Sequence, residues 1–182
     1  MSPVPEEEKP ILIGLAGQPN VGKSTVFNLL TGLNQHVGNW PGKTVERREG
    51  SLVHDGAQLR VVDLPGTYSL TANSPEERVA RDFILHERPD VVIMIADAAA
   101  LERNLYLLSE LLLLPVPVVL GLNMMDVARA QGIEIEPHVL AAALGLPVVL
   151  MVASRARGVA ELASAALRLA REPTAFKPAR PE

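Results

Sequence analysis

Apolar residues gather in five short, almost uninterrupted runs, and the stretches between them have helical spacing. The runs are ILIGLAG (11–17), LRVVDLPG (59–66), VVIMIAD (91–97), VPVVLGLN (116–123) and LPVVLMVAS (146–154). Continuous Val, Ile and Leu segments of this length are typical of parallel strands that are buried on both faces. We therefore predict five parallel strands in one sheet.

The segments between the runs predict the rest of the fold. Leucines at 101, 105, 108 and 112 share one helical face, as do the apolar residues at 159, 162, 166 and 169. Residues 44–56, followed by LRVVD, indicate an added hairpin with Asp55-Gly56 as its turn. The pattern therefore predicts an α/β fold: a mostly parallel six-stranded sheet with one antiparallel edge strand and helices on both faces.

The ends of the chain differ in composition from its middle. Residues 1–9 and 172–182 are rich in proline and charge, so we expect flexible tails around one domain at 10–171. The start does not have the basic and apolar regions of a signal peptide. The most apolar segment, LYLLSELLLLPVPVVLGL, is interrupted by Glu110, Pro115 and Pro117. It reads as a buried helix and a strand, so we expect a soluble chain.

The amino-acid composition excludes some kinds of bond and binding site. Of 182 residues, 48% are hydrophobic, which indicates a globular domain. The absence of cysteine excludes disulfides and thiolate metal sites. The net charge of −4 argues against a broad nucleic-acid surface.

The first run leads into GQPNVGKS (17–24), which fits the phosphate-loop pattern G-x-x-x-x-G-K-[ST] between a strand and a helix. Its glycines let backbone amides point at phosphate oxygens, and the helix N-terminus adds a favourable dipole. Lys23 would reach the β- and γ-phosphates and Ser24 would bind Mg²⁺. We assign the nucleotide phosphates to Gly17, Gln18, Pro19, Asn20, Val21, Gly22, Lys23, Ser24 and Thr25.

The second run ends in Asp-Leu-Pro-Gly. Asp63 is placed to hold Mg²⁺ through a water, and Gly66 to offer its amide to the γ-phosphate. DLPG alone would be only a turn. Its position some forty residues after the phosphate loop favours the functional interpretation.

The last two runs end in residues that suit a guanine base. Asp126 of Asn-Met-Met-Asp can accept two hydrogen bonds from guanine, and Asn123 would brace the pocket. A backbone amide of Ala153-Ser154-Arg155 would meet the guanine oxygen. A lone N-x-x-D could instead cap a helix. Four motifs in order at four strand ends favour guanine.

These motifs together resemble a TRAFAC-class small GTPase with a Ras-like P-loop fold. VGNWPGKTVERREG, VDLPGTYSL, ADAAALERNLYL and LNMMDVA resemble, more specifically, the amino-terminal cytoplasmic G domain of the FeoB family, the bacterial ferrous iron transport proteins B. The similarity runs from about residue 9 to about residue 171. It implies GTP hydrolysis that regulates or drives ferrous iron uptake at the cytoplasmic face of the bacterial inner membrane.

The resemblance also assigns residues in the loop between the hairpin and the phosphate loop. It makes this loop switch I, in which Thr44 binds Mg²⁺ and senses the γ-phosphate. It implies a K⁺ site formed by Asn20 with the carbonyls of Gly38 and Trp40. The only tryptophan, Trp40, is therefore expected in a mobile functional loop, the alternative being a loop tryptophan packed against the domain.

Several positions depart from the wider class. Met124 replaces the lysine that often stacks on guanine, which implies weak affinity, and the side chain of Gln18 is not expected to contact nucleotide. Thr67 stands where many relatives have the glutamine that orients water. We expect the water to be held by backbone near Thr44 and Gly66, with Lys23 and Asn20 completing the catalytic set and slow turnover as the result. Arg47 and Arg48 are expected to point away from the phosphates.

The family's helical regulatory domain and membrane permease are absent from this sequence, so we expect a piece of a longer protein, with those domains as partners and self-association left open. Two alternatives remain. A ribosome- or tRNA-associated GTPase shares GxPNVGKST but needs a basic face. A guanine-nucleotide sensor would bind without hydrolysis, and a phosphate-release assay separates it from an enzyme.

Overall fold

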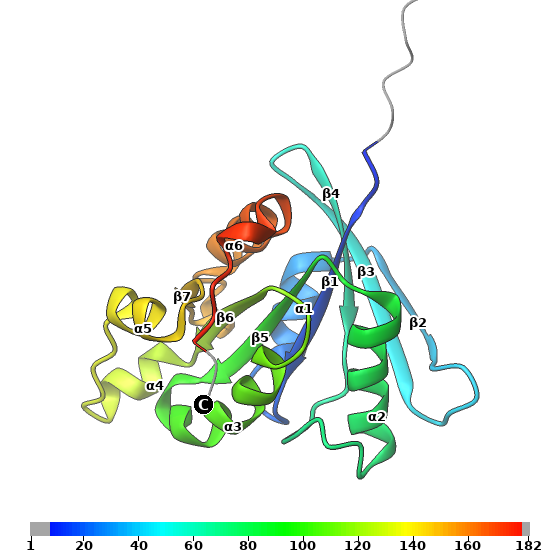
Figure 1. The fold of residues 1–182 in the computed structure, drawn as a ribbon. Coiled ribbons are helices and arrows are strands. Elements are labelled where there is room, and N and C mark those ends of the chain that lie inside the picture. Colours follow the sequence, from blue (N-terminus) through cyan, green and yellow to red (C-terminus); the bar gives the residue numbers. More distant parts are fainter. Residues whose placement is uncertain (1–7, 180–182) are drawn as a thin grey trace, which may run out of the picture.

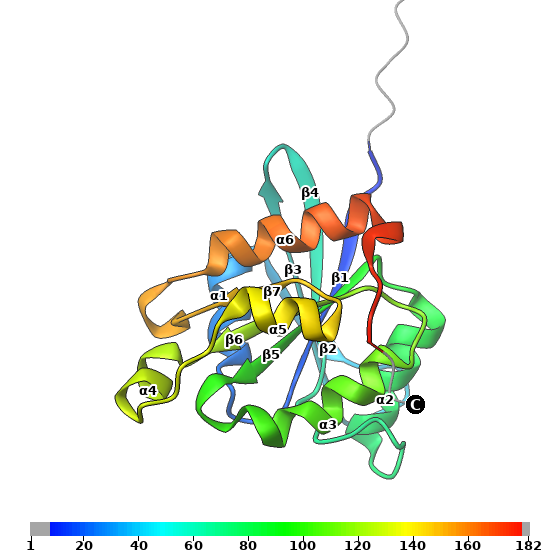
Figure 2. The same ribbon diagram turned by 60° about the vertical axis from the view of Figure 1, so that its left-hand side comes forward.

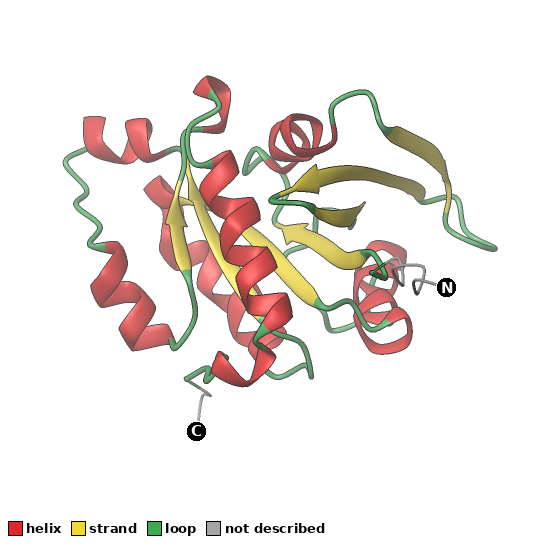
Figure 3. Cartoon of the chain, turned by 90° about the horizontal axis from the view of Figure 1, so that it is seen from above, coloured by secondary structure: helices red, strands yellow, loops and turns green. Residues whose placement is uncertain are grey.

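The fold is a twisted sheet with helices on both faces, seen in a computed structural model that describes residues 8–179 (Figures 1 and 3). Its strands are β1 (Ile11–Gly17), β2 (Gln35–Asn39), β3 (Glu46–His54), β4 (Ala57–Asp63), β5 (Val91–Asp97), β6 (Val118–Asn123) and β7 (Val148–Leu150). Its α-helices are α1 (Lys23–Thr31), α2 (Pro75–Asp82), α3 (Leu101–Leu112), α4 (Met125–Ala130), α5 (Pro137–Leu144) and α6 (Val159–Arg171). A π-helix, η1 (Phe83–Glu87), continues α2, and 3₁₀ turns lie at η2 (Ala98–Ala100), η3 (Ala153–Arg155) and η4 (Pro173–Ala175).

The strand order is β2-β3-β4-β1-β5-β6-β7. Strands β4, β1, β5, β6 and β7 are parallel neighbours, which confirms the α/β class and the five parallel strands predicted from the apolar runs. The Asp55-Gly56 turn is also confirmed. Both residues have positive φ, 48° and 76°, as a two-residue hairpin of this kind requires.

The predicted number of strands and the predicted position of the antiparallel strand at the edge of the sheet are both wrong. The sheet has seven strands, and its antiparallel strand β3 lies second from the edge because β2 pairs outside it. Strand β2 has the sequence QHVGN and is mostly exposed, so it lacks the alternation that reveals a half-buried strand. Only its main-chain pairing with β3 defines it.

Two hydrophobic clusters cover the two faces of the sheet. Helices α1 and α6 pack on one face, where α6 lies across the strands in Figure 2. Helices α2, α3 and α4 pack on the other face. Strand β5 is buried along almost its whole length because it is covered on both sides. This burial holds the carboxyl ends of β1, β4, β5 and β6 in one rigid layer, where an α/β sheet binds its ligands.

The described part of the predicted C-terminal tail contacts the domain. Turn η4 follows α6, Phe176 packs against both clusters, and the N–H of Ala179 donates to the carbonyl of Leu144 at 2.9 Å. Residues 1–7 and 180–182 lie outside the described residues. The flexibility of both tails stays a prediction.

Gly50 allows β3 to lie close to the end of α1. A Cβ at this position would lie 2.5 Å from Cγ2 of Thr31 and 2.7 Å from the carbonyl oxygen of Asn34. We predict that Gly50→Ala lowers the free energy of unfolding by about 1–3 kcal/mol because backbone must shift to accept the methyl group. Gly38→Ala is the control, since a Cβ there meets no atom within 4 Å. Urea denaturation measures both, and equal stability of the two variants would contradict the prediction.

Candidate nucleotide-binding site

The loop between β1 and α1 has the geometry of a phosphate cradle. Asn20 and Gly22 have positive φ, 66° and 90°, which turns the chain sharply before α1 begins at Lys23. A pocket opens on this loop and is lined by Gln18, Pro19, Asn20, Gly22, Lys23, Ser24, Thr25 and Gly66. All of the predicted phosphate residues except Gly17 and Val21 therefore line one cavity at the N-terminus of a helix, where backbone amides favour an anion.

A buried ion pair lies at this cradle. Lys23 at the start of α1 contacts Oδ1 of Asp63, the last residue of β4. Their side chains are only 11% and 9% exposed. Burial raises the pKa of the Asp63 carboxyl above its ordinary value, and the charge of Lys23 opposes this shift without cancelling it. The sequence-predicted phosphate lysine and magnesium aspartate are thus in direct contact.

Asn123 joins the phosphate loop to the loop after β7. Its Nδ2 donates to the carbonyl of Val21 at 3.0 Å, and its Oδ1 accepts the N–H of Ala153 at 2.9 Å. The side chain is 3% exposed. Because both ends of the amide are satisfied by backbone of distant loops, the predicted bracing role agrees with the geometry.

The start of α4 does not fit the alternative interpretation of N-x-x-D as a helix cap. Its N-cap is Met124, in the left-handed conformation at φ 62°, and no side-chain capping bond is made. Asp126 lies half-buried in the first turn of α4, and the N–H of Met125 in the same turn donates to the carbonyl of Met151 at 3.2 Å. In the loop after β7, the N–H of Ala153 donates to Asn123 and that of Arg155 to the carbonyl of Val152.

The loop after β4 lies directly against the phosphate loop. The N–H of Thr67 donates to the carbonyl of Gly17 at 3.1 Å, and Thr67 is 5% exposed. A Cβ on Gly66 would lie 3.2 Å from the backbone nitrogen of Pro19. Gly66 is therefore held at the cavity by close backbone contact. The side chain of Gln18 turns away and donates to the carbonyl of Arg103 at 2.5 Å, as expected for a residue that does not contact nucleotide.

The residues predicted in switch I do not lie at this cavity. Thr44 is exposed, and Gly38 is paired with Arg47 in the β2–β3 ladder. The carbonyl of Trp40 accepts the N–H of Lys43 at 3.0 Å, closing a turn. None of the three lines the pocket that contains Asn20, so this conformation does not assemble the expected K⁺ site or bring Thr44 to the expected Mg²⁺ site.

Trp40 is packed in this structure, as in the alternative of a loop tryptophan packed against the domain, and the mobility of its loop stays a prediction. It is 7% exposed and contacts Phe83 of η1 edge to face, with ring centroids 6.0 Å apart. The Arg47 guanidinium lies 4.3 Å from the centre of the indole. Arg47 also bonds to Glu49 at 3.1 Å and to Glu87 of η1 at 3.3 Å. Sequence reasoning missed Phe83 and Glu87, because they follow Trp40 and Arg47 by about forty residues and belong to no motif themselves.

The two arginines after Thr44 differ from each other. Arg47 points away from the phosphate loop, as expected. Arg48 is on the other side of β3, where it lies 5.7 Å from the ring of Phe27 and opposite Asp63 in the β3–β4 register. The two arginines therefore face opposite sides of the sheet, as neighbouring strand residues do. Neither lines the pocket at the phosphate loop.

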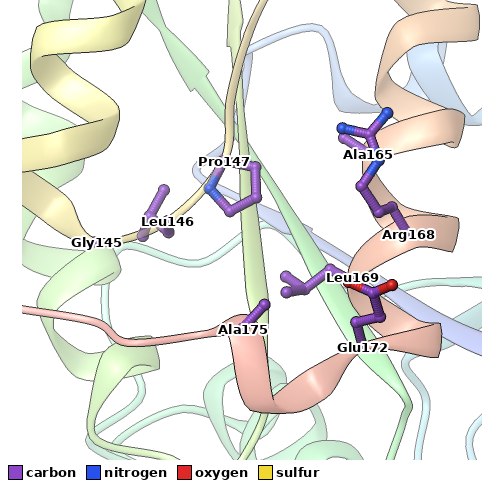
Figure 4. A pocket seen from close by; sticks show the side chains of 8 residues that line it. All are labelled: Gly145, Leu146, Pro147, Ala165, Arg168, Leu169, Glu172 and Ala175. Atoms are coloured by element: carbon purple, nitrogen blue, oxygen red, sulfur yellow. The ribbon is translucent and has the colours of Figure 1, made fainter.

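A second pocket lies at the opposite end of the strands. Figure 4 shows it between the segment before β7, helix α6 and turn η4, lined by Gly145, Leu146, Pro147, Ala165, Arg168, Leu169, Glu172 and Ala175. None of the sequence-predicted site residues lines it. Within residues 8–179, no group of three or more His, Asp or Glu side chains is placed to hold a metal ion.

The family model for ferrous iron transport protein B matches residues 11–166. The chain belongs to the FeoB family. It is 49% identical over 158 residues to the Fe(2+) transporter FeoB of Shigella flexneri and to that of Escherichia coli K12. In each case the match covers 85% of this chain but only 20% of the relative. The chain therefore spans about a fifth of the length of these curated FeoB proteins.

Solved FeoB structures share the fold. A mutant NFeoB of S. thermophilus bound to mGDP is 46% identical with a TM-score of 0.83, covering 87% of this chain and 60% of that one. The cytosolic domain of T. maritima FeoB in GDP form II is 40% identical with a TM-score of 0.89, covering 96% and 68%. Its GMPPNP form is 40% identical with a TM-score of 0.86, covering 94% and 67%. The Ras-like G-domain fold expected from the motifs is confirmed.

The packing of Trp40 leads to a prediction. We expect Arg47→Ala to make Trp40 more accessible to acrylamide and to lower stability by about 0.5–2 kcal/mol, because the guanidinium covers the indole face. Arg48→Ala is the matched control, since Arg48 contacts Phe27 on the other side of β3. Fluorescence quenching of the single tryptophan measures the effect. Equal quenching in the two variants would show that Arg47 does not shield the ring.

Proposed function

We propose that this chain binds GTP and hydrolyses it slowly as the cytoplasmic G domain of a ferrous iron transporter. The observation that carries the proposal is the Asn123 amide, which ties the phosphate loop to the loop after β7. A phosphate cavity and a base-reading loop held together by one buried side chain suit a purine nucleotide. The GDP and GMPPNP forms of FeoB relatives support the same choice.

The phosphates would occupy the cavity of the β1–α1 loop. The backbone N–H groups of residues 18 and 20–25 and the ammonium of Lys23 would bind their oxygens, and Lys23 would leave Asp63 to do so. Ser24 and Asp63 supply the hard oxygen donors that suit Mg²⁺, with Asp63 acting through a water. The bound ion would neutralise charge between the β- and γ-phosphates. Thr44 would join this set only after the turn at 40–45 opens.

Guanine would lie between the loops after β6 and β7. Asp126 would accept two hydrogen bonds from the base, while the N–H of Ser154 would donate to its oxygen. The residues that flank the base would be Asn123, Met124, Ala153 and Arg155. Met124 offers apolar contact in place of a stacking lysine, which suits weak affinity and fast exchange.

Hydrolysis would depend on positioning rather than on a general base. Thr67 occupies the place of the usual glutamine, but it is buried and its N–H is bonded to Gly17. The attacking water would then be held by backbone groups near Gly66 and Thr44, and slow turnover is the consequence. A domain that binds GTP without releasing phosphate would instead be a nucleotide sensor.

Potassium activation, which the family resemblance implies, needs a change of conformation in this chain. Asn20 lies at the phosphate cavity, whereas Gly38 lies in the β2–β3 ladder and the carbonyl of Trp40 closes the turn that follows β2. A K⁺ site at Asn20 would require Gly38 and Trp40 to move to this cavity. Its effect should therefore depend on the mobility of residues 38–45.

The iron-transport part of the proposal concerns a longer protein. None of the helices in the described region has the length and apolar character needed to span a bilayer. Transport would therefore belong to the permease and helical regulatory domains of the family, with this domain at the cytoplasmic face of the inner membrane. The acidic net charge of −4 favours this assignment over a ribosome- or tRNA-associated role.

Phosphate release tests the enzymatic proposal. At equal ionic strength we expect K⁺ to accelerate GTP turnover about tenfold or more over Na⁺, well below the 10³–10⁵ of an arginine finger. Asn20→Gly should remove most of this acceleration, and glycine tolerates the positive φ of residue 20. No phosphate release in either salt would make the chain a sensor. Equal rates in both salts would refute potassium activation alone.

Asp126 tests the choice of base. Asp126→Asn should weaken GDP binding by about 2–4 kcal/mol, because a charged hydrogen bond is lost and an amide donor faces a guanine donor. The same variant should gain affinity for xanthosine diphosphate. Calorimetry measures both ligands, with Asp55→Asn in the exposed β3–β4 turn as control. Unchanged GDP affinity in Asp126→Asn would show that this carboxylate does not read the base.

A further inference from the structure

The segment that carries Gly66 has neither helix nor strand, so its position depends on a few main-chain bonds. The N–H of Leu64 donates to the carbonyl of Leu15 at 2.9 Å, and that of Thr67 to Gly17 at 3.1 Å. The N–H of Leu70 donates to Oε2 of Glu110 at 2.5 Å. The first two acceptors are backbone atoms of β1. The third acceptor is the side chain of Glu110 on α3, forty residues away. Of these three bonds, it is the one that a substitution of its acceptor residue removes.

Helix α3 also holds the phosphate loop. Gln18, which is 7% exposed, donates from Nε2 to the carbonyl of Arg103 at 2.5 Å. Arg103 and Glu110 are seven residues apart, which is about two helical turns or roughly 10 Å along the axis. The phosphate loop and the Leu70 end of the Gly66 segment are therefore attached to two points of one rigid helix. That helix fixes the distance between them.

The bond to Glu110 is one that the segment cannot easily replace. Leu70 is 7% exposed and packs in the cluster beneath α2 and α3. Without Glu110, its N–H would be a donor without a partner at a largely buried residue, which is costly. A carboxylate is also a stronger acceptor than a neutral oxygen. The hydroxyl of Thr71 and the N–H of Asn73, in contrast, donate to Glu77 near the start of α2.

We propose that Glu110 is a positioning residue for the γ-phosphate side of the site. It does not touch the nucleotide. It holds Leu70, and through residues 67–70 it keeps the backbone of Gly66 against Pro19, where the hydrolytic water and the γ-phosphate would meet. The inference rests on the proposed GTPase function, and it predicts that Glu110 matters for hydrolysis and not for the affinity for GDP.

Three variants of the full chain test this role. Glu110→Ala removes the acceptor, Glu110→Gln keeps a neutral one, and Glu102→Ala removes an exposed carboxylate from the first turn of the same helix. In Glu110→Ala we expect kcat for GTP to fall at least about tenfold, since small displacements of reacting groups are costly. KM and the affinity for GDP should stay near those of the parent. Glu110→Gln should restore most of kcat, and Glu102→Ala should behave as the parent.

Amide hydrogen exchange gives a readout without nucleotide. The Leu70 N–H should exchange faster in Glu110→Ala than in the parent or in Glu102→Ala. Parental kcat in a folded Glu110→Ala would overturn the inference, as would an equal loss of GDP affinity and kcat, or a Glu110→Gln variant as slow as Glu110→Ala. A parent that releases no phosphate would refute the proposed function. The exchange of Leu70 would then decide on its own whether Glu110 holds this segment.

Discussion

The buried amide of Asn123 is the contact on which the candidate site depends. It comes from the end of β6 and binds the backbone of the β1–α1 loop on one side and that of the loop after β7 on the other. In an α/β sheet, loops at the strand ends are free to vary in conformation, whereas the strands are fixed by their ladders. A side chain that hydrogen-bonds to the backbone of two loops at once restricts the conformation of both. It also explains why Gly22 must be glycine, because a Cβ there would collide with Nδ2 of Asn123.

The charges of the site are arranged for a ligand that brings its own negative charge. Lys23 and Asp63 neutralise each other in a buried position, yet burial still raises the pKa of Asp63. A pair of this kind contributes little net stability, because desolvation of both ions offsets their attraction. A polyphosphate with a divalent cation would give each member a new partner. Under the proposed function, Lys23 and Asp63 would therefore serve as two ligand-binding groups and not as a structural element.

The layered fold and most residues of the candidate site could be predicted from the sequence, because the signals for both are local. The apolar runs are local signals, and the motifs at their ends converge because parallel strands bring their carboxyl ends to one edge. The sequence does not predict strand β2 or the contacts of Trp40. QHVGN has no alternation of apolar and polar residues. Trp40 contacts Phe83, and Arg47 bonds to Glu87, in a π-helix that no sequence motif indicates. Glu110 likewise occupies a helical face with no motif, and only the fold shows that Leu70 reaches it.

The packing of Trp40 constrains how Thr44 could ever reach the phosphate cavity. Removing an indole from a buried site forfeits about 4–6 kcal/mol, taking 150–250 Å² at roughly 25 cal/mol per Å². The turn that follows is closed by two main-chain bonds, Trp40 to Val45 at 2.9 Å and Lys43 to Trp40 at 3.0 Å. Opening these two main-chain bonds costs only about 0.5–1.5 kcal/mol each. The less costly route is therefore to open residues 41–45 while Trp40 stays docked on Phe83. On this route the tryptophan would be the pivot of the loop, which would give a packed side chain a reason to lie in the proposed switch I.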